Sequence, residues 1–579
     1  MPHTDRAVVG ATLVALALPA SAAAAVPPAT LTKVDVPGTT AFAATPDDLS
    51  VYGYVEEEYY VTGTANRYRI VDPLRDAQVV DGGHPYKTRV IVRRPADPAR
   101  FNGTLAVEWY NVTTGQDIDF DWAASHEYLM RSGYAAVSLS AQLVGVDRLK
   151  TWSPTRYGDL SLTAPNTDPA GGVLDARGDV LGWDAFSQTV QALRDGALPS
   201  LSVKRVIANG ESQSAGRLTS YYNSIDPLHR VIDGIVYYDR GGPWRADSPT
   251  KAISVATEFG SRTGPTYPDS PNLRLWEVAG TSHVSLHDMR YVDAITGRDK
   301  GLPAPVTLTE LITGCAYEPL WSTVPTHQVL NAAFDHVNRW IQGFAAPPSA
   351  ARMERDPSVN PPVLRRDAAD RVLGGIRLAE FTHPTAFTLG GLNTGPGFCY
   401  LAGHHRFYTA AELAALYPDP HAYVRGVVDT TAANLTAGYI LGADASETVD
   451  AAYRVFDLGT ATGPVGGTVP ATLSLTVAPA SFGAFTPAVA REYTTSTTAT
   501  VISSAGDATL SVGEPGRLAN GSFTLAQPLR VLGLPKVYAA PVANDVVPIS
   551  FTQAIGANEP LRTGAYSTTL TFTLSTTNP

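Results

Sequence analysis

A serine on a predicted strand-to-helix turn is the first residue whose surroundings could support chemistry. Ser212 is the centre of the sequence GESQS (210–214), which follows the apolar, strand-like segment 203–208 and precedes a helical pattern. GESQS has the form G-x-S-x-S and differs in one residue from the nucleophile-elbow pattern G-x-S-x-G. That elbow needs small residues on both sides of the nucleophile because its turn is strained, and Gly210 and Ser214 are small. The pattern predicts that Ser212 is a nucleophile.

A serine hydroxyl is a poor nucleophile at neutral pH and needs a base that is oriented by an acid. In hydrolases with such an elbow these groups follow in the chain order Ser, Asp or Glu, His. The strand-like segment 253–257 ends at Glu258, and the segment 273–279 leads into a loop with His283. We therefore expect His283 to be the base and Glu258 the acid. Asp239, which ends the preceding strand-like segment, is the substitute acid.

The oxyanion of an acyl-transfer intermediate needs N–H donors. One should be the backbone amide of Gln213, directly after the nucleophile. The second should come from the loop after the strand-like segment 104–109, where the amides of Asn111 and Val112 are the candidates. Such a site supports acyl transfer through a covalent serine intermediate, with a small-molecule or polymeric ester as the candidate substrate, and needs no cofactor. Peptidase and acyltransferase chemistry would use the same residues.

Two other functions compete with serine chemistry. A metal-dependent hydrolase could use His283 and His287, which are four residues apart, but the Glu of the motif H-E-x-x-H is absent. A non-catalytic surface binding protein on a hydrolase scaffold would require Ser212 and His283 to lie out of reach of each other. The serine hypothesis requires no metal, and we assign none.

The segments that carry these residues alternate between strand and helix patterns over 26–457. The strand-like segment 104–109 is followed by a helical pattern over 121–131, which ends before Ser132-Gly133, and then by the strand-like segment 135–139. Strands that alternate with helices predict an α/β fold with a mostly parallel sheet covered on both faces. The carboxyl ends of its strands are where chemistry is expected.

The last 112 residues, 468–579, differ from the rest because they contain no His, Cys or Trp. Short β-branched runs separated by turn residues predict an antiparallel β-sandwich, joined to the body by the Gly- and Thr-rich linker 458–467. This region resembles the immunoglobulin-like modules of secreted bacterial proteins. The resemblance implies a spacer or a module for attachment to the cell surface.

The N-terminus has the pattern of a signal peptide over 1–25. Arg6 precedes an apolar run, 7–18, and small residues with A-x-A cleavage sites follow. No later stretch is apolar enough to span a membrane, so we expect a secreted, extracellular protein. In an oxidising compartment the two cysteines, Cys315 and Cys399, predict one disulfide.

The net charge of −11, from 43 basic and 54 acidic side chains, argues against binding to nucleic acid or to anionic membranes. The hydrophobic fraction of 44% is enough for a large core and excludes a disordered chain.

The chain as a whole resembles a family of secreted bacterial alpha/beta-hydrolase-domain proteins that are esterase-like. The matching segments are RRPADP (93–98), VEWYNV (107–112), GESQS (210–214), GTSH (280–283) and LYP (416–418). The resemblance implies the α/β-hydrolase fold and carboxylic-ester hydrolysis, with Ser212, Glu258 and His283 as the triad. It leaves the ester substrate open.

Overall fold

The structure is a computed structural model that describes residues 26–239, 242–262, 267–300, 309–456, 473–505 and 507–576. The predicted signal peptide and the predicted linker lie outside these ranges. The chain divides into two compact units, Met1–Thr460 and Ala461–Pro579, and each is described by itself.

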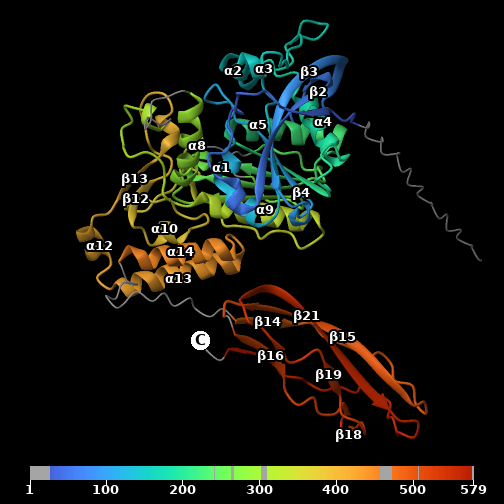
Figure 1. Cartoon of the computed structure of the whole chain (residues 1–579). Helices are drawn as coiled ribbons and strands as arrows, with labels where there is room; N and C mark the ends of the chain where they lie inside the picture. The colour runs from blue at the N-terminus through green and yellow to red at the C-terminus, as the bar shows by residue number, and fades with distance from the viewer. Residues whose placement is uncertain are drawn as a thin grey trace, which may run out of the picture. The chain divides into compact units, whose positions relative to one another are not determined.

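The first unit is built on a central sheet that includes β2, β3 and β4 (Figure 1). The sheet has nine strands in the order β1-β2-β3-β5-β4-β6-β7-β8-β9. Its strands are β1 (Thr30–Lys33), β2 (Tyr54–Arg69), β3 (Gln78–Pro95), β4 (Thr104–Trp109), β5 (Ala135–Leu139), β6 (Arg205–Glu211), β7 (Gly234–Tyr238), β8 (Lys251–Thr257) and β9 (Leu273–Val278). The strands β4 to β9 pair in parallel, whereas β1, β2 and β3 form an antiparallel edge. The predicted, mostly parallel sheet is confirmed.

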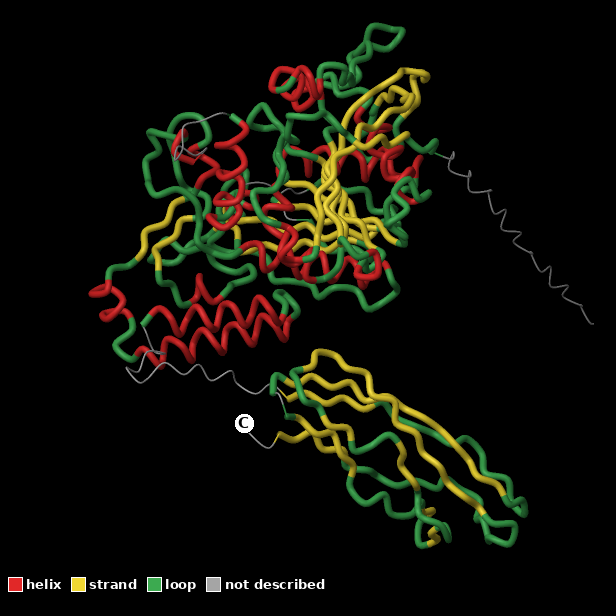
Figure 2. Tube along the Cα trace, in the orientation of Figure 1, coloured by secondary structure: helices red, strands yellow, loops and turns green. Residues whose placement is uncertain are grey.

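Helices connect the parallel strands (Figure 2). They are α1 (Phe120–Arg131), α2 (Leu143–Trp152), α3 (Pro154–Tyr157), α4 (Gly182–Arg194), α5 (Ser212–Ser220), α6 (Asp226–His229) and α7 (Glu258–Ser261). Two further helices, α8 (Leu286–Asp299) and α9 (Thr326–Ile341), follow β9. Along the sheet, α1 connects β4 to β5 in one direction, and the connection through α4 returns from β5 past β4 to β6. Because such crossovers are right-handed, α1 and α4 lie on opposite faces of the sheet.

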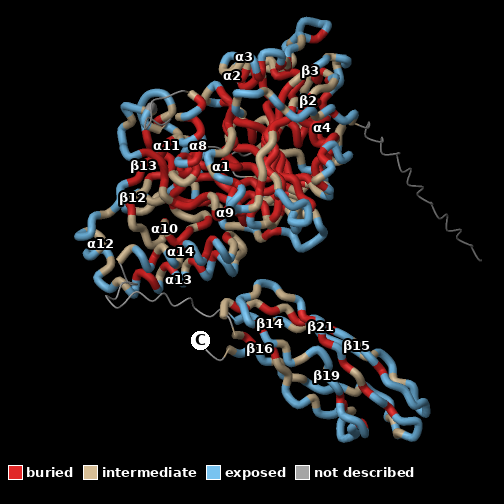
Figure 3. The backbone as a smooth tube through the Cα atoms, viewed as in Figure 1, coloured by how far each residue is buried: buried red, intermediate tan, exposed pale blue. Residues whose placement is uncertain are grey.

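The central strands are apolar and buried on both sides, as a covered parallel sheet requires (Figure 3). Every residue of β4, β5 and β7 is buried. Two buried arginines of β3 attach the loop after β4 to the sheet: Arg89 donates to Asp117 at 2.9 Å and Arg93 to Asp119 at 2.6 Å. This loop, which contributes to the site below, is therefore held from beneath by charged hydrogen bonds.

Smaller elements after α9 complete the first unit. Two hairpins pair β10 (Arg355–Asp356) with β11 (Val363–Leu364) and β12 (Ala386–Leu389) with β13 (His404–Phe407). The helices are α10 (Ala379–Thr382), α11 (Cys399–Ala402), α12 (Ala410–Leu416), α13 (Pro420–Ala437) and α14 (Gly442–Val455). Within the described ranges, no helix combines the length and the apolar character that a membrane crossing needs.

The second unit consists of antiparallel strands. One sheet has the order β14-β15-β21-β19, a second has β20-β16-β22, and β17 pairs with β18. The strands are β14 (Leu473–Val477), β15 (Arg491–Ser503), β16 (Ala508–Val512), β17 (Ala519–Asn520), β18 (Phe523–Thr524), β19 (Arg530–Leu532), β20 (Lys536–Val537), β21 (Val542–Ile555) and β22 (Phe572–Thr576). A buried apolar cluster that includes Val501, Leu510 and Ile549 takes residues from both larger sheets. The arrangement fits the predicted β-sandwich.

Candidate active site

The predicted nucleophile lies on a strained turn between β6 and α5. Ser212 is the first residue of α5 and has a φ of +50°, in the left-handed region that side chains rarely adopt. A Cβ added to Gly210 would lie 3.0 Å from the Oγ of Ser214 and 3.1 Å from a Leu218 methyl, so the position favours glycine. The Ser214 hydroxyl donates to the Glu211 carbonyl at 2.8 Å and accepts from the Glu211 amide at 3.0 Å. The serine at the fifth elbow position thus has a structural role in the turn.

The predicted base is paired with the substitute acid. His283 lies in the loop after β9, and its Nδ1 donates to the Oδ2 of Asp239, which follows β7. The Oδ1 of Asp239 accepts from the amide of Thr257 at 2.8 Å and from its hydroxyl at 2.5 Å. Asp239 also has a left-handed φ, +51°. The carboxylate is therefore fixed by hydrogen bonds and oriented toward the imidazole.

The structure does not bring Glu258 to His283, which corrects the primary expectation for the acid. Glu258 is buried at the start of α7, where its Oε2 accepts from the amide of Gly280 at 3.0 Å and its Oε1 from Arg366 at 2.5 Å. It supports the loop that leads to His283 instead. Both acids follow parallel strands and both precede His283 in the chain, so their order could not distinguish them.

We expect Glu258→Gln to reduce stability but not catalysis. The amide removes the charge that pairs with Arg366, and breaking this largely buried pair should cost about 2 kcal/mol of unfolding free energy. The kcat should stay within a few-fold of wild type because the amide oxygen can still accept from Gly280. Denaturant unfolding and ester kinetics check this. Arg366→Gln should reproduce the stability loss, and a loss in kcat of about 10³-fold or more in Glu258→Gln would return Glu258 to the triad.

A second carboxylate faces the other nitrogen of the imidazole. The Oε1 of Glu211 is 3.0 Å from the Nε2 of His283, and its Oε2 accepts from the side-chain amide of Asn111 at 2.8 Å. Burial lowers the pKa of His283, but the carboxylates of Glu211 and Asp239 outweigh burial and raise this pKa to about 10. Burial raises the pKa of the Glu211 carboxyl, and His283 opposes that shift. Sequence reasoning missed Glu211, although its place directly before the nucleophile was a usable signal.

Among the described residues, no hydrogen bond joins the Ser212 hydroxyl to His283. The imidazole nitrogen that would accept the serine proton faces Glu211, the neighbouring residue, instead. Catalytic hydrogen bonds are often incomplete in free enzymes and form in the substrate complex.

Two of the three predicted oxyanion donors lie at the elbow, and the third is bonded within its own loop. The amide of Gln213 lies in the first turn of α5, where helix amides lack an intrahelical partner. The amide of Val112 donates to the side-chain oxygen of Gln213 in a long hydrogen bond of 3.4 Å, which an oxyanion would have to displace. The amide of Asn111, however, donates to the Ile118 carbonyl at 2.9 Å. That donor is occupied, which corrects its assignment; Asn111 serves the site through its side chain.

A small apolar pocket adjoins His283 and Glu211. Its volume is about 50 Å³. The lining residues are Asn111, Thr113, Thr114, Phe120, Glu211, His283, Val284, Met289, Ile312, Trp321, Phe398 and Leu401. A pocket with such a wall suits a small apolar group.

The predicted disulfide between Cys315 and Cys399 is present. It joins the segment next to Ile312 to the segment 398–401, and both contribute to the pocket wall. The carbonyl of Leu401 also accepts from the backbone amide of His283 at 3.3 Å. The bond therefore supports the wall of the pocket beside His283.

We expect removal of this disulfide to reduce stability and to weaken substrate binding. Closing a loop of 84 residues stabilises by about 4 kcal/mol in the chain-entropy model. The double variant Cys315→Ala/Cys399→Ala should lose about that much unfolding free energy and show a higher KM. Denaturant unfolding of oxidised wild type, reduced wild type and variant measures the loss. An unfolding midpoint that is the same in reduced wild type and in the variant as in oxidised wild type would contradict the prediction.

The metal-hydrolase alternative is not supported by the geometry. Within the described part of the chain, the only group of three or more potential ligands that converge is His287, Asp288 and His327, and it does not include His283. His283 is held between two carboxylates instead. His283 and His287 therefore do not form a common ligand set.

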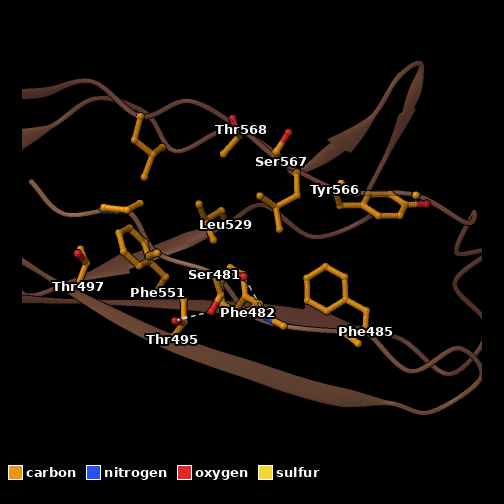
Figure 4. Close-up of a pocket in the computed structure, with 18 of the residues that line it drawn as sticks. Ser481, Phe482, Phe485, Thr495, Thr497, Leu529, Phe551, Tyr566, Ser567 and Thr568 are labelled. Atoms are coloured by element: carbon orange, nitrogen blue, oxygen red, sulfur yellow. Dashed lines mark hydrogen bonds between the residues drawn. The ribbon is translucent and has the colours of Figure 1, made fainter. Parts of the chain in front are cut away.

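A larger cavity lies in the second unit, with a volume of about 810 Å³. Figure 4 shows Phe482, Phe485 and Tyr566 around it, together with hydroxyl side chains such as Thr495. The lining residues include no His, Cys or carboxylate. This cavity lacks the imidazole and carboxylates found at the site in the first unit, and attachment through this unit stays a prediction.

Comparison with known proteins agrees with the fold. A family model described as "Alpha/beta hydrolase domain" matches residues 24–450. No curated protein matches the sequence.

Similar solved structures include a rice cell wall degrading esterase, LipA, from Xanthomonas oryzae, with 13% identity over 40% of this chain and 50% of that one and a TM-score of 0.20. The chain thus covers about half of LipA. The siderophore hydrolase EstB from Aspergillus nidulans has 14% identity over 47% of this chain and 100% of that one, with a TM-score of 0.23. The glucuronoyl esterase from Solibacter usitatus has 10% identity over 47% of this chain and 89% of that one, with a TM-score of 0.22.

Proposed function

Since the chain belongs to the alpha/beta hydrolase domain family, we propose that it is a serine esterase with Ser212, His283 and Asp239 as its catalytic triad. One observation carries this proposal. The imidazole of His283 donates to a fixed, buried carboxylate at the same sheet edge as a serine on a strained elbow. A base with an orienting acid beside a nucleophile is the arrangement that acyl transfer needs.

The reaction proceeds in two steps. His283 Nε2 takes the proton of Ser212 while the serine oxygen attacks the ester carbonyl, and the proton then passes to the departing alcohol. Water next attacks the acyl-enzyme with His283 again as the base, which releases the acid and the free serine. The amides of Gln213 and Val112 are the donors for the oxyanion in both steps. For the first step, the imidazole moves from the Glu211 carboxylate to the adjacent Ser212 hydroxyl.

The substrate is an ester with a small apolar acyl group. The pocket beside His283 is apolar over most of its wall and has a volume of about 50 Å³. Acetyl and propionyl groups suit such a space, whereas long acyl chains do not.

The protein acts outside the cell. This part of the proposal is supported by the signal-peptide pattern of residues 1–25 and by the disulfide, which persists in oxidising compartments. The C-terminal unit attaches the enzyme to a surface or serves as a spacer.

Fluorophosphonate labelling of the purified full chain, followed by peptide mapping, tests the mechanism. We expect a label on Ser212 in wild type and no label in Ser212→Ala or His283→Ala. A folded wild-type protein without a label on Ser212 would overturn the serine mechanism. A panel of p-nitrophenyl esters from acetate to octanoate then tests the acyl preference.

A further inference from the structure

A group of metal-ligating side chains lies outside the triad, where the first turns of two helices meet. His287 and Asp288 belong to the first turn of α8, and His327 belongs to the first turn of α9. One ligand atom from each side chain lies within 4.8 Å of the other two. Two imidazoles and a carboxylate are the donor types that Zn²⁺ and related transition-metal ions prefer.

The carboxylate of this group has one oxygen fixed and one oxygen free. Asp288 is fully buried, with 0% exposure. Its Oδ2 accepts from the Tyr238 hydroxyl at 2.7 Å and from the Ser285 amide at 2.8 Å. Its Oδ1 is buried without a partner in the described part of the chain. An unpaired buried carboxylate oxygen is costly, and a metal ion would satisfy it while Tyr238 orients the carboxylate.

The imidazoles of the group contribute a second unpaired buried atom. The Nδ1 of His327 is buried and unpaired within the described ranges, and the ring of His287 is partly buried beside it. Their rings stack with centroids 3.8 Å apart and planes at 19°. Most other buried polar groups of the unit are paired, so two unpaired ligand atoms beside a second imidazole point to a missing common partner.

We propose that His287, Asp288 and His327 bind one transition-metal ion of the Zn²⁺ class. Two nitrogens and one oxygen supply three of four tetrahedral positions, and water supplies the fourth. One imidazole turns out of the stack on binding, because the lone pairs of parallel rings lie in separate planes. Mg²⁺ and Ca²⁺ do not fit, since they prefer oxygen ligands alone.

Metal binding would join α8 and α9 to the end of β7. Tyr238, which holds Asp288, is the last residue of β7 and directly precedes Asp239. The ion would therefore stabilise the region around the acid without touching the serine, and the inference does not depend on the proposed function.

The test uses the full chain without an affinity tag, treated with EDTA and then dialysed. Zn²⁺ affinity is measured by competition with a fluorescent chelator, and Co²⁺ binding by its visible absorption. We expect one Zn²⁺ per chain, a Co²⁺ spectrum of the tetrahedral type, and a Tm that rises with Zn²⁺ but not with Mg²⁺. His287→Ala and His327→Ala should each weaken Zn²⁺ binding by about 100-fold.

The matched control is His336→Ala, which removes another histidine of α9 whose Nε2 contacts the Gly438 carbonyl at 2.8 Å. It should bind Zn²⁺ as wild type does. Equal Zn²⁺ affinity in wild type and in His327→Ala would overturn the proposal, as would an octahedral Co²⁺ spectrum. If His327→Ala does not fold by circular dichroism, His327→Gln takes its place. Fluorophosphonate labelling of the EDTA-treated protein reports separately on the triad.

Discussion

Asp239→Asn should lower kcat by about 10³- to 10⁴-fold, the largest effect of any single change outside Ser212 and His283. The reason is the tautomer of His283. In the neutral imidazole, Nδ1 donates to Asp239, which leaves the Nε2 lone pair to accept the serine proton. An asparagine that presented its amide nitrogen to Nδ1 would place the imidazole proton on Nε2, where it blocks the base.

The orientation of that asparagine follows from Thr257. The Oδ1 of Asp239 accepts two hydrogen bonds from Thr257, one from the amide and one from the hydroxyl. The asparagine oxygen must stay on that side, because its NH₂ group cannot accept these donors. The NH₂ group therefore faces His283.

The measurement is single-turnover and steady-state kinetics with a p-nitrophenyl acetate substrate. KM should change little, since Asp239 contacts the base and not the pocket. Glu258→Gln is the matched control. Glu258 is a buried carboxylate that precedes the same histidine in the chain but pairs with Arg366. Equal losses of kcat in both variants would contradict the assignment of Asp239.

Glu211→Gln should move the acidic limb of the pH–rate profile to lower pH, by about 1–2 pH units. The base must be deprotonated, so activity rises as the pH rises through the pKa of His283. That pKa is raised to about 10, because the carboxylates of Glu211 and Asp239 outweigh the lowering effect of burial. Removing the Glu211 charge lowers the pKa, so a larger share of the enzyme carries a free base at about pH 7.

The activity at about pH 7 should then rise by about tenfold for each pH unit by which the acidic limb moves. The glutamine can retain the geometry, with its oxygen accepting from Asn111 as Oε2 does now. The experiment compares kcat/KM from about pH 5 to about pH 10 in wild type, Glu211→Gln and Glu258→Gln. An acidic limb that stays in place in Glu211→Gln would show that Glu211 does not set the pKa of the working base.

The elements of the site could be predicted from local sequence. Gly210 and Ser214 around Ser212, after an apolar segment and before a helix, identified the elbow because the strained turn accepts few residue types. The alternation of apolar strands with helices predicted the parallel sheet, since each strand is buried on both faces. Cys315 and Cys399 could pair only with each other, as no other cysteine exists.

The partners of the imidazole were decided by tertiary structure. Asp239 and Glu258 satisfy the same chain order, and only the sheet shows that β7 lies next to β6 while Glu258 turns toward Arg366. The occupied amide of Asn111 and the contact of Glu211 with His283 likewise depend on chain segments that only folding brings together. Local sequence determines where a turn or strand forms because the forces act between near neighbours. Which charged group reaches a given nitrogen depends on chain paths that meet only after folding, and at this site that decides the acid and the pKa of the base.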